Sequence, residues 1–510
     1  MFLVGIDASI IGVAIPRITA SFRSLDDIAW YGSAYMLPCT VLQPSFGAFF
    51  KSFNVTYVYM ASIILFEAGS VLCAAAPTST AFILGRAVSG CGAAGIFQGA
   101  LSIIGYTVEK KKIPLYYGYV VSVFGISTCT APIFGGALTD HVSWRWCFWI
   151  NLPIGCVVLV LVPMFIRVRL SNDALRKMPV LVRLRRIDWI GTVLFTGAFT
   201  CLFLALQWGG QIKPWKSPEV IGLIVGFALL LGVFVWTQKL MGERSLIPLR
   251  LLKQRTVLFG SMYLLLMYLA LSVYLYYIPI YFQAIRGTSA TNSGVRIIAL
   301  DVSRVVFVVI AAALVTKWGH YMPFMVAGSG IGAIGAGLLT MLDVDTGTAL
   351  STIYMLIWGA GAGIGANQPF TALQAALSEN DMPIGNGITV FALQLGSALA
   401  YAISQTMFLT EVFHLVETNP LTQNISRSAI LAAGATNLGR LSTNPETVRV
   451  VRSAYISAIK DVMLVALVSV CLAHLALPGM EWLKIPVDKA GEQDEEMVAP
   501  IKEGNESRGN

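Results

Sequence analysis

Long apolar segments alternate with short polar breaks along almost the whole chain, from residue 2 to residue 481. A helix needs about 20 predominantly apolar residues to cross the hydrocarbon core of a bilayer. Repeated segments of this kind are typical of a polytopic helical membrane protein. About fourteen spans are predicted, at approximately 2–19, 28–50, 57–76, 80–107, 114–138, 143–166, 188–208, 218–238, 256–282, 294–316, 321–341, 347–370, 384–410 and 459–481.

The first span is unusual. In "MFLVGIDASIIGVAIPRI" roughly 14 apolar residues precede Pro16, fewer than a spanning helix requires. The stretch has no basic n-region and no small-residue cleavage site, so it does not resemble a signal peptide. We expect either that the start of the chain is missing or that the first helix is truncated.

Composition supports the membrane interpretation and excludes other classes. Hydrophobic residues make up 56% of the chain and charged residues 12%, whereas a globular protein averages about a quarter charged residues. The net charge of +8 comes from residues in short breaks rather than from a basic domain, which argues against nucleic-acid binding. The sequence has no nucleophile motif, no phosphate-binding loop and no metal-ligand cluster, so we expect neither an enzyme nor a cofactor or metal.

The basic residues also predict an orientation. With a cytoplasmic N-terminus, seventeen Lys and Arg residues fall in inside loops and five in short outside loops, as the positive-inside rule requires. The break at 411–458 then lies outside and contains a glycosylation sequon at Asn424. Asn54 and Asn505 begin sequons on the cytoplasmic side, where they would stay unmodified. The polar segment 482–510 is predicted to be a disordered cytoplasmic tail.

Two neighbouring spans carry faces of small residues. In the fifth span the small residues are spaced by four, three, four, three and four positions, so they lie on one face of a helix. They are Gly118, Ser122, Gly125, Cys129, Pro132 and Gly136. Gly135 widens this face near the outer end. The fourth span has a similar face, at Gly85, Ser89, Gly92 and Gly99, with Gly95 beside it. Small faces let helix backbones approach closely, so the two spans are predicted to form a tight pair.

Several stretches together resemble one family. These are "DASIIGVAIPRI", "GRAVSGCGAAGIFQGAL", "APIFGGALTDHVSWRWCFWINLPIG" and "ILAAGATNLG" followed by "GMEW". They resemble the major facilitator superfamily, specifically the fungal fourteen-span drug/proton antiporters that export toxins and xenobiotics. The fifth-span pattern is similar to the antiporter motif of that superfamily.

The resemblance implies an all-α membrane protein with two six-helix bundles around a central cavity, two additional helices between them, alternating access and proton antiport. The corresponding units are 1–166 for the first bundle, 167–255 for the basic loop and linker helices, and 256–481 for the second bundle.

The chain also departs from the family pattern. After the second span the superfamily expects G-x-x-x-D-x-x-G-R-K, whereas this chain keeps Gly47 and has Lys51 in place of the aspartate. The cytoplasmic latch attributed to that motif is therefore in doubt. Ser127 and Ala131 stand where the antiporter motif usually has glycine, although the face stays small.

Charges within spans are expensive and mark functional sites. Asp7 in the first span and Arg86 in the fourth match family positions, and Glu67 lies in the third span within "FEAGS". A carboxyl group in a low-dielectric cavity holds a proton more firmly than in water, and a nearby arginine favours the ionised form. A carboxylate that alternately faces water and Arg86 is thus a candidate proton switch. An ordinary interhelical ion pair is the alternative.

Other polar residues are candidates for the cavity. Asp301 and Arg304 lie three residues apart and can neutralise each other on one helix, or they can set a preference for charged substrates. The remaining cavity candidates are the amides Gln98, Asn367, Gln368, Gln394 and Gln405. Amides at membrane depth need partners, so hydrogen bonds to neighbouring helices are an equal alternative.

The prediction is a secondary active transporter that exports hydrophobic or amphipathic small molecules, driven by the proton gradient. We expect a monomer in the plasma membrane, with the vacuolar membrane as the alternative. A superfamily importer, or a carrier of siderophores or basic amino acids, is the first rival function. A non-transporting membrane sensor is the second, and the short tail argues against it.

Overall fold

The computed structural model describes residues 1–24, 27–166, 178–210, 213–288, 290–427, 429–430, 438, 441 and 444–485. Helices dominate these residues, and no β-sheet occurs among them. The helices longer than three residues are α1 (Phe2–Phe22), α2 (Ile28–Val41), α3 (Gln43–Ser52), α4 (Val55–Ala74), α5 (Ser79–Thr107), α6 (Ile113–His141), α7 (Trp146–Trp149), α8 (Asn151–Phe165), α10 (Val180–Arg185), α11 (Trp189–Trp208), α12 (Pro218–Met241), α13 (Leu249–Lys253), α14 (Arg255–Ala284), α15 (Ala290–Trp318), α16 (Met322–Thr340), α17 (Thr348–Gly365), α18 (Gln368–Ala376), α19 (Met382–Thr418) and α21 (Pro445–Ala476).

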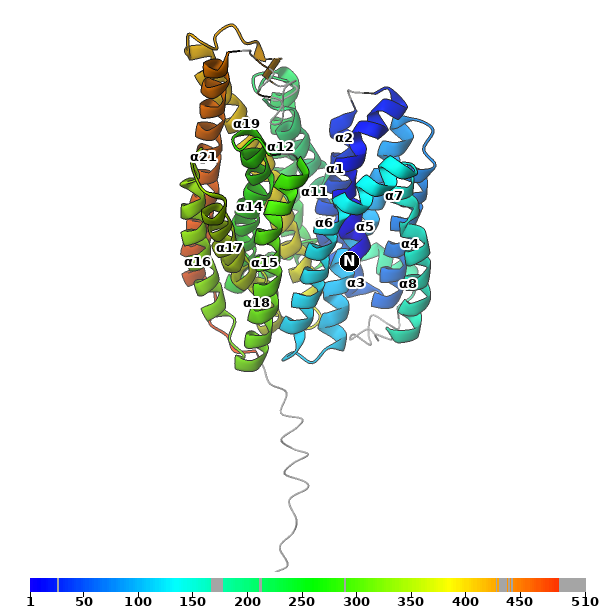
Figure 1. Cartoon of the computed structure of the whole chain (residues 1–510). Helices are drawn as coiled ribbons and strands as arrows, with labels where there is room; N and C mark the ends of the chain where they lie inside the picture. The colour runs from blue at the N-terminus through cyan, green and yellow to red at the C-terminus, as the bar shows by residue number, and fades with distance from the viewer. Residues whose placement is uncertain are drawn as a thin grey trace, which may run out of the picture.

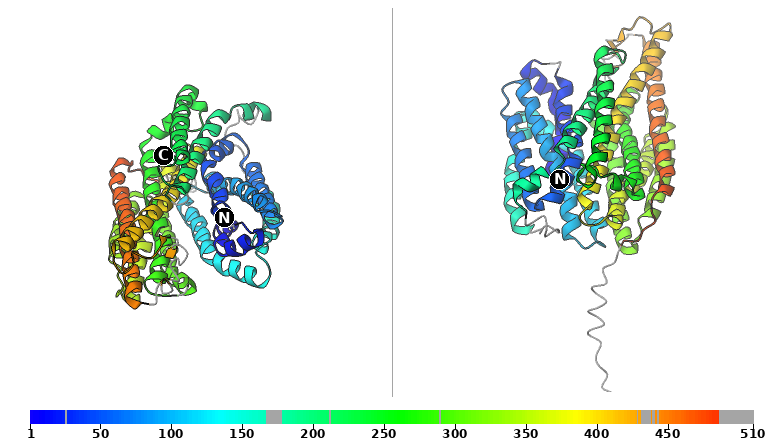
Figure 2. Two further views of the ribbon diagram at one scale, coloured as in Figure 1. Left: turned by 90° about the horizontal axis from the view of Figure 1, so that it is seen from above. Right: turned by 180° about the vertical axis from the view of Figure 1, so that it is seen from behind.

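The helices form two groups side by side. Helices α1–α8 gather on one side, which we call the N-half, and α14–α21 on the other, the C-half (Figures 1 and 2). Helices α11 and α12 pack on each other, and α11 also contacts α2 of the N-half and α19 of the C-half. Helix α11 therefore bridges the two halves.

The helices coincide with the predicted spans. Eleven described helices are long and apolar enough to cross a membrane. The other three predicted spans fall on α1, on α6 and on the consecutive helices α2 and α3. The all-α membrane fold is confirmed, while the count of fourteen crossings stays a prediction.

The first predicted span, 2–19, corresponds to α1, which continues to Phe22 and is 21 residues long. The predicted boundaries of the last long loop were wrong. The loop predicted at 411–458 is helical at both ends, since α19 extends to Thr418 and α21 begins at Pro445. Charged residues such as Arg449 and Arg452 make the first turns of α21 polar, so the pattern of apolar residues alone placed its start too late. The N-cap at Asn444, which accepts from the Glu446 amide, and the proline that follows it are the signals of the true start.

Both sequons that the structure describes lie in turns between helices. Asn424 is exposed, between α19 and α21. Asn54 caps α4 by accepting a hydrogen bond from the Thr56 amide at 2.9 Å. Glycosylation of Asn424 stays a prediction.

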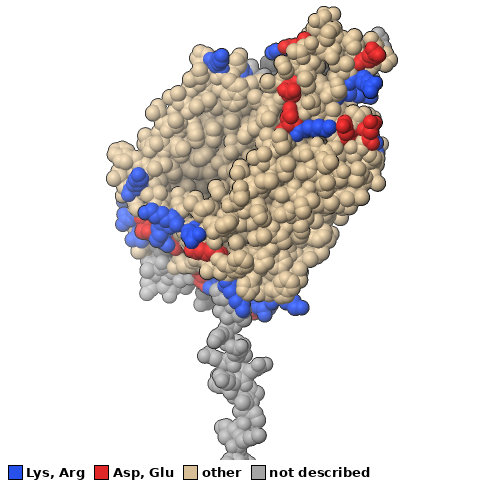
Figure 3. Space-filling view, turned by 90° about the vertical axis from the view of Figure 1, so that its left-hand side faces the viewer, with Lys and Arg blue, Asp and Glu red and all other residues tan. Residues whose placement is uncertain are grey.

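Charged side chains collect toward the two ends of the molecule, and the surface between them is mostly uncharged (Figure 3). We call the end that carries Lys51, the turn at 108–112, Arg244 and Lys317 the basic end, and the other the opposite end. The uncharged band between them is what a bilayer-spanning protein requires, because a charge facing hydrocarbon is costly.

The small-residue faces pack closely, but not on each other as predicted. Helix α5 packs chiefly on α4 and α2, and its glycines lie against the α4 backbone and side chains: a Cβ atom on Gly85 would lie 2.9 Å from the Cys73 amide nitrogen. Gly92 faces Phe66, and Gly99 faces Tyr59. Helix α6 instead packs on α1 and, across the halves, on α15. The spacing of small residues identifies the packing face but not its partner.

Candidate functional site

An ion pair is enclosed within the N-half. Nη1 of Arg86, on α5, lies 2.6 Å from Oδ2 of Asp7, on α1, and both side chains are 1% exposed or less. Nε of Arg86 donates to the Tyr31 carbonyl at 3.1 Å, and its guanidinium lies 4.3 Å from the centre of the Tyr35 ring. Two charges predicted separately from the sequence are thus direct partners. They tie α1 to α5 and give the buried Arg86 guanidinium a counter-charge.

Glu67 does not join this pair. It lies on α4 beside a small pocket of about 120 Å³ within the N-half, with its carboxylate against Gly155 of α8. Both carboxylate oxygens are buried, and the described part of the chain offers them no hydrogen-bond partner. Of the two candidate carboxylates, Asp7 therefore faces Arg86 in this structure and Glu67 does not.

A larger cavity of about 500 Å³ lies between the halves. Five helices line it, α1 and α2 from the N-half, the linker α11, and α14 and α19 from the C-half. Its walls are apolar with scattered hydroxyl and amide groups and no charged side chain. The lining residues are Ile15, Gly32, Ser33, Met36, Leu37, Thr40, Phe203, Leu206, Gln207, Tyr276, Gln394, Ser397, Ala398, Tyr401 and Ala402. We call this space the central cavity.

The halves are in close contact between the central cavity and the basic end. A Cβ atom on Gly47 of α3 would lie 2.7 Å from the Pro383 carbonyl oxygen, and one on Gly387 of α19 would lie 2.8 Å from the Gln43 carbonyl oxygen. Nε2 of Gln374 also donates to the Tyr117 hydroxyl at 2.5 Å. An apolar cluster beside these contacts contains residues of both halves, Leu101, Ile104, Ile113, Tyr117, Leu264, Phe370, Val390 and Leu393. The basic end is therefore closed.

Two ion pairs at Asp381 reinforce the closure, one across the halves and one to the segment that follows the linker helices. Nζ of Lys51 lies 3.1 Å from Oδ1 of Asp381, and Nη2 of Arg250 lies 2.9 Å from its Oδ2. Burial acts to raise the pKa of Asp381, but hydrogen bonds from Arg250 and Lys51 outweigh it and hold the pKa below its ordinary value. Lys51, which departs from the family pattern, thus has an acidic partner at the start of α19. We call these three residues the basic-end latch.

The fifth-span face meets the C-half near a second ion pair. Gly118 of α6 faces Ala312 of α15, and a Cβ atom on Gly125 would lie 3.1 Å from Cγ2 of Val305 and 3.4 Å from Nη2 of Arg304. That Nη2 lies 3.0 Å from Oδ1 of Asp301, with both side chains 12–13% exposed. The pair lies at the contact between halves and does not line the central cavity. The predicted self-neutralising pair is present.

The rest of the fifth-span face contacts the N-half. Gly135 is buried against Ile10 of α1, and Gly136 is half-buried. Position 132 belongs to α6, but the Pro132 side chain lies outside the described residues. The predicted single face is thus divided between α15 and α1.

Of the predicted cavity amides, only Gln394 lines the central cavity, where its Nε2 lies 3.6 Å from Sγ of Cys39. Nε2 of Gln98 donates to the Pro383 carbonyl across the closed basic end at 2.5 Å, and Nε2 of Gln368 donates to the Ile364 carbonyl at 3.1 Å. Asn367 is buried between α17 and α18, and Gln405 is half-buried further along α19. Interhelical bonding therefore explains Gln98 better than a cavity role.

The family described as the Major Facilitator Superfamily matches residues 1–401 of the chain. The chain belongs to this superfamily. It is 39% identical over 495 residues to the MFS-type efflux pump MFS1 of Arthroderma benhamiae, which covers 95% of this chain and 90% of that protein. It is 38% identical over 487 residues to the efflux pump aflT of Aspergillus parasiticus, covering 95% and 94%.

Solved structures of the superfamily share the fold. The proton:xylose symporter XylE, bound to 6-bromo-6-deoxy-D-glucose, superposes with a TM-score of 0.59 at 14% identity and covers 93% of this chain and 92% of that one. The human organic anion transporter MFSD10 gives a TM-score of 0.53 at 10% identity, covering 92% and 97%. This major facilitator protein is a membrane transporter and not an enzyme.

Sequence reasoning missed several residues of this transporter. Asp381 was detectable, because the basic replacement at Lys51 calls for an acidic partner and Asp381 directly precedes a helix with proline near its start. Gln207 and Tyr401 gave no signal, since an amide or a phenol near the end of an apolar span also suits the membrane interface. Their place in the central cavity depends on how α11 and α19 pack.

Proposed function

We propose that this transporter exports neutral hydrophobic or amphipathic small molecules in exchange for protons. The observation that carries the proposal is the central cavity between the halves, apolar in most of its wall and separated from the basic end by close packing. About 500 Å³ is within the range of ordinary small-molecule sites. Two relatives whose names describe efflux pumps support the direction.

The lining chemistry selects the class of substrate. No lining residue carries a charge, and the polar groups of the cavity are hydroxyls and amides such as Gln394 and the pair in which Nε2 of Gln207 donates to the Ser33 hydroxyl at 2.7 Å. A carrier of basic amino acids would need an anionic group at this site, because burying an unpaired cation is costly. A neutral molecule with a few polar atoms satisfies the cavity without that cost.

With the basic end in the cytoplasm, the structure corresponds to the outward-facing state of an alternating-access cycle. The latch and the contacts of α3 and α5 with α19 close the cytoplasmic path. Substrate is released from this state, and a proton is taken up as the protein leaves it. The chain functions as a monomer in the plasma membrane in this proposal.

Coupling is assigned to Asp7 and Arg86. In the present state their charges neutralise each other in a site closed to water. Movement of α1 relative to α5 would separate them, and a carboxylate that loses its cationic partner in a low-dielectric site is neutralised by a proton. Each change of state then takes up or releases one proton at Asp7.

The test is accumulation of three dyes in cells with and without the protein: neutral Nile red, cationic rhodamine 6G and anionic fluorescein. We expect the protein to lower Nile red most, and a protonophore to abolish the difference. Export that survives the protonophore would refute proton coupling. Stronger export of fluorescein than of Nile red would refute the assigned substrate class.

A further inference from the structure

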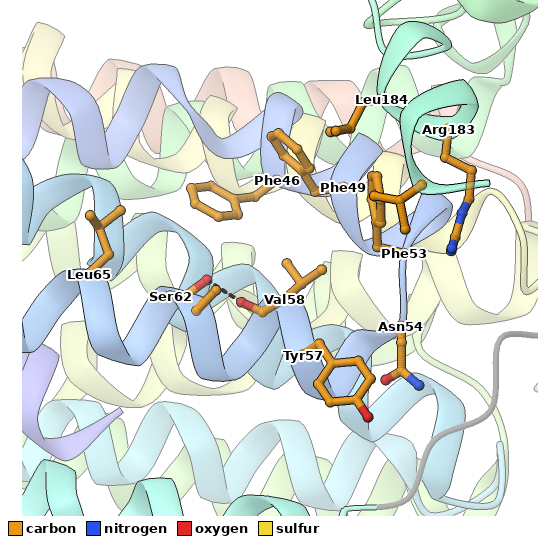
Figure 4. A pocket seen from close by; sticks show the side chains of 12 residues that line it. Phe46, Phe49, Phe53, Asn54, Tyr57, Val58, Ser62, Leu65, Arg183 and Leu184 are labelled. Atoms are coloured by element: carbon orange, nitrogen blue, oxygen red, sulfur yellow. Dashed lines mark hydrogen bonds between the residues drawn. The ribbon is translucent and has the colours of Figure 1, made fainter.

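An apolar groove lies on the N-half near the basic end, separate from the central cavity. It has a volume of about 670 Å³ and is bounded by α3, α4 and α10 (Figure 4). Phe46 and Phe49 of α3, with Phe53 just after its end, line one side, and Tyr57 and Leu65 of α4 line the other. Tyr57 is 72% exposed and Leu65 37%, so the groove opens outward from the helix bundle.

The groove does not belong to the pathway between the halves. Phe46 and Phe49 are three residues apart and share one face of α3, and Phe53 directly follows the last residue of that helix. Gly47 and Gln43, on another part of the same helix, contact α19 of the C-half. None of the groove residues lines the central cavity. Helix α3 thus offers one surface to the other half and a second surface to the surrounding membrane.

The mouth of the groove is cationic. Arg183 of α10 lines it, and its guanidinium carbon lies 5.2 Å from the centre of the Phe53 ring. Its Nε is buried, and no described residue accepts a hydrogen bond from it. Arg185 and Arg186 follow on exposed positions. A guanidinium with an unused donor, fixed at the end of an apolar groove, favours an anionic and amphipathic ligand.

Helix α10 has the composition of an element at the membrane surface. Val180 and Leu181 are 56% and 63% exposed, and arginines occupy the following positions. Trp189, at the start of α11, is 47% exposed and donates through Nε1 to the Leu184 carbonyl at 2.9 Å. Exposed apolar residues beside arginines and a tryptophan are typical of headgroup depth. The mouth therefore lies at the headgroups and the body of the groove at the acyl chains.

We propose that this groove binds a diacyl phospholipid with an anionic headgroup from the leaflet at the basic end. An acyl chain lies along the phenylalanines of α3 and the exposed face of α4, and the headgroup phosphate accepts from Arg183. The site fixes α10 against the N-half and is independent of what the central cavity transports.

The test is native mass spectrometry of the purified full chain in detergent, with added phosphatidylserine or phosphatidylcholine of identical acyl chains. We expect phosphatidylserine to bind more tightly. Arg183→Gln lowers this binding about fivefold, the contribution of one basic residue near an anionic headgroup. Arg183→Lys, which keeps the charge, retains most of it.

Two further variants distinguish lipid binding in this groove from general attraction of the anionic headgroup to basic residues. Arg185→Gln removes the same charge from the same helix outside the groove and leaves binding unchanged. Ala61→Trp fills the groove from α4 and lowers phosphatidylserine binding, although Arg183 is retained. Thermal unfolding of each variant in detergent checks that the fold is kept.

Three results would overturn the proposal. Equal binding of phosphatidylcholine would mean a layer of unselected lipid, and equal losses in the Arg183 and Arg185 variants would mean diffuse attraction. Competition by glycerophosphoserine, which has the headgroup without acyl chains, would mean a simple anion site. We expect no such competition even at a large excess.

Discussion

The two Asp–Arg pairs at membrane depth are built differently. Asp7 and Arg86 come from different helices and are fully enclosed, so they can part only if α1 and α5 move. Asp301 and Arg304 lie one turn apart on α15 and remain together wherever that helix goes. An interhelical pair can therefore respond to a change of state, whereas a pair within one helix mainly neutralises itself. We therefore propose that coupling rests on the first pair and that the second pair stabilises the contact between the halves.

The largest effect is expected from Asp7→Asn. The variant leaves the Arg86 guanidinium enclosed without a counter-charge, which costs about 3–5 kcal/mol. Thermal unfolding in detergent measures the loss. The double variant Asp7→Asn/Arg86→Gln removes both charges and recovers most of this stability, and a double variant as unstable as the single one would contradict the direct coupling of the two residues.

Packing around the second pair is expected to matter more than its charge. A Cβ atom on Gly363 of α17 would overlap the Arg304 carbonyl oxygen, a backbone atom that cannot move aside. Gly363→Ala therefore destabilises the protein by about 1–3 kcal/mol. The matched control is Gly337→Ala on α16, where no heavy atom lies within 4 Å, and its stability stays within about 0.5 kcal/mol of the parent. A harmless Gly363→Ala would show that α15 and α17 pack less tightly than described.

The basic-end latch is expected to contribute less, because Lys51 is 27% and Arg250 53% exposed. Asp381→Asn removes both pairs and shifts the ratio of closed to open basic ends by roughly fivefold, equivalent to about 1 kcal/mol. Ser102→Cys, on α5 beneath the closure, reports the shift through its labelling by a membrane-impermeant maleimide. Labelling that Asp381→Asn does not accelerate would mean that packing alone holds the end closed.

Asp301→Asn is expected to cost about 1 kcal/mol, because the asparagine carbonyl oxygen can still accept the hydrogen bond from Arg304 on the same helix and only the charge of the acceptor is lost. Nile red export stays at the parent level in the same variant, since the pair does not line the central cavity. Loss of export with normal expression would move the second pair into the coupling machinery.

The smallest effect is expected from a change of pH, which should leave the closure of the basic end unaltered in the physiological range. The pKa of Asp381 is depressed, so the ionised carboxylate is present throughout the physiological range. The latch contributes fully above the ordinary pKa of an aspartate and is lost only as pH falls through the depressed value. The ratio of the Ser102→Cys labelling rates with Asp381 and with Asp381→Asn is thus constant from about pH 5 to pH 8, because the thiolate fraction changes equally in both proteins. A change in that window would require another titrating group at the closure.

The sequence predicted the positions of the helices better than which helices and residues contact each other. Spans were visible because each is apolar on its own, and Asp7 and Arg86 were conspicuous because charges are rare there. Their direct pairing depends on how α1 lies against α5, which periodicity does not encode. The glycines of α5 and α6 likewise revealed two packing faces, and the expected pairing of these faces was wrong. Lys51 was noticed as an anomaly, but its partner Asp381 lies far away in sequence and becomes evident only once the halves are assembled.

The central claim is that Asp7 and Arg86 couple export to protons. The direct measurement uses proteoliposomes with the double variant Asp7→Asn/Arg86→Gln and the compound that the cell assay shows to be exported most strongly. We predict that the variant still exchanges labelled for unlabelled compound across the membrane and no longer accumulates it in response to a pH gradient. Gradient-driven accumulation equal to that of the parent protein would contradict the account.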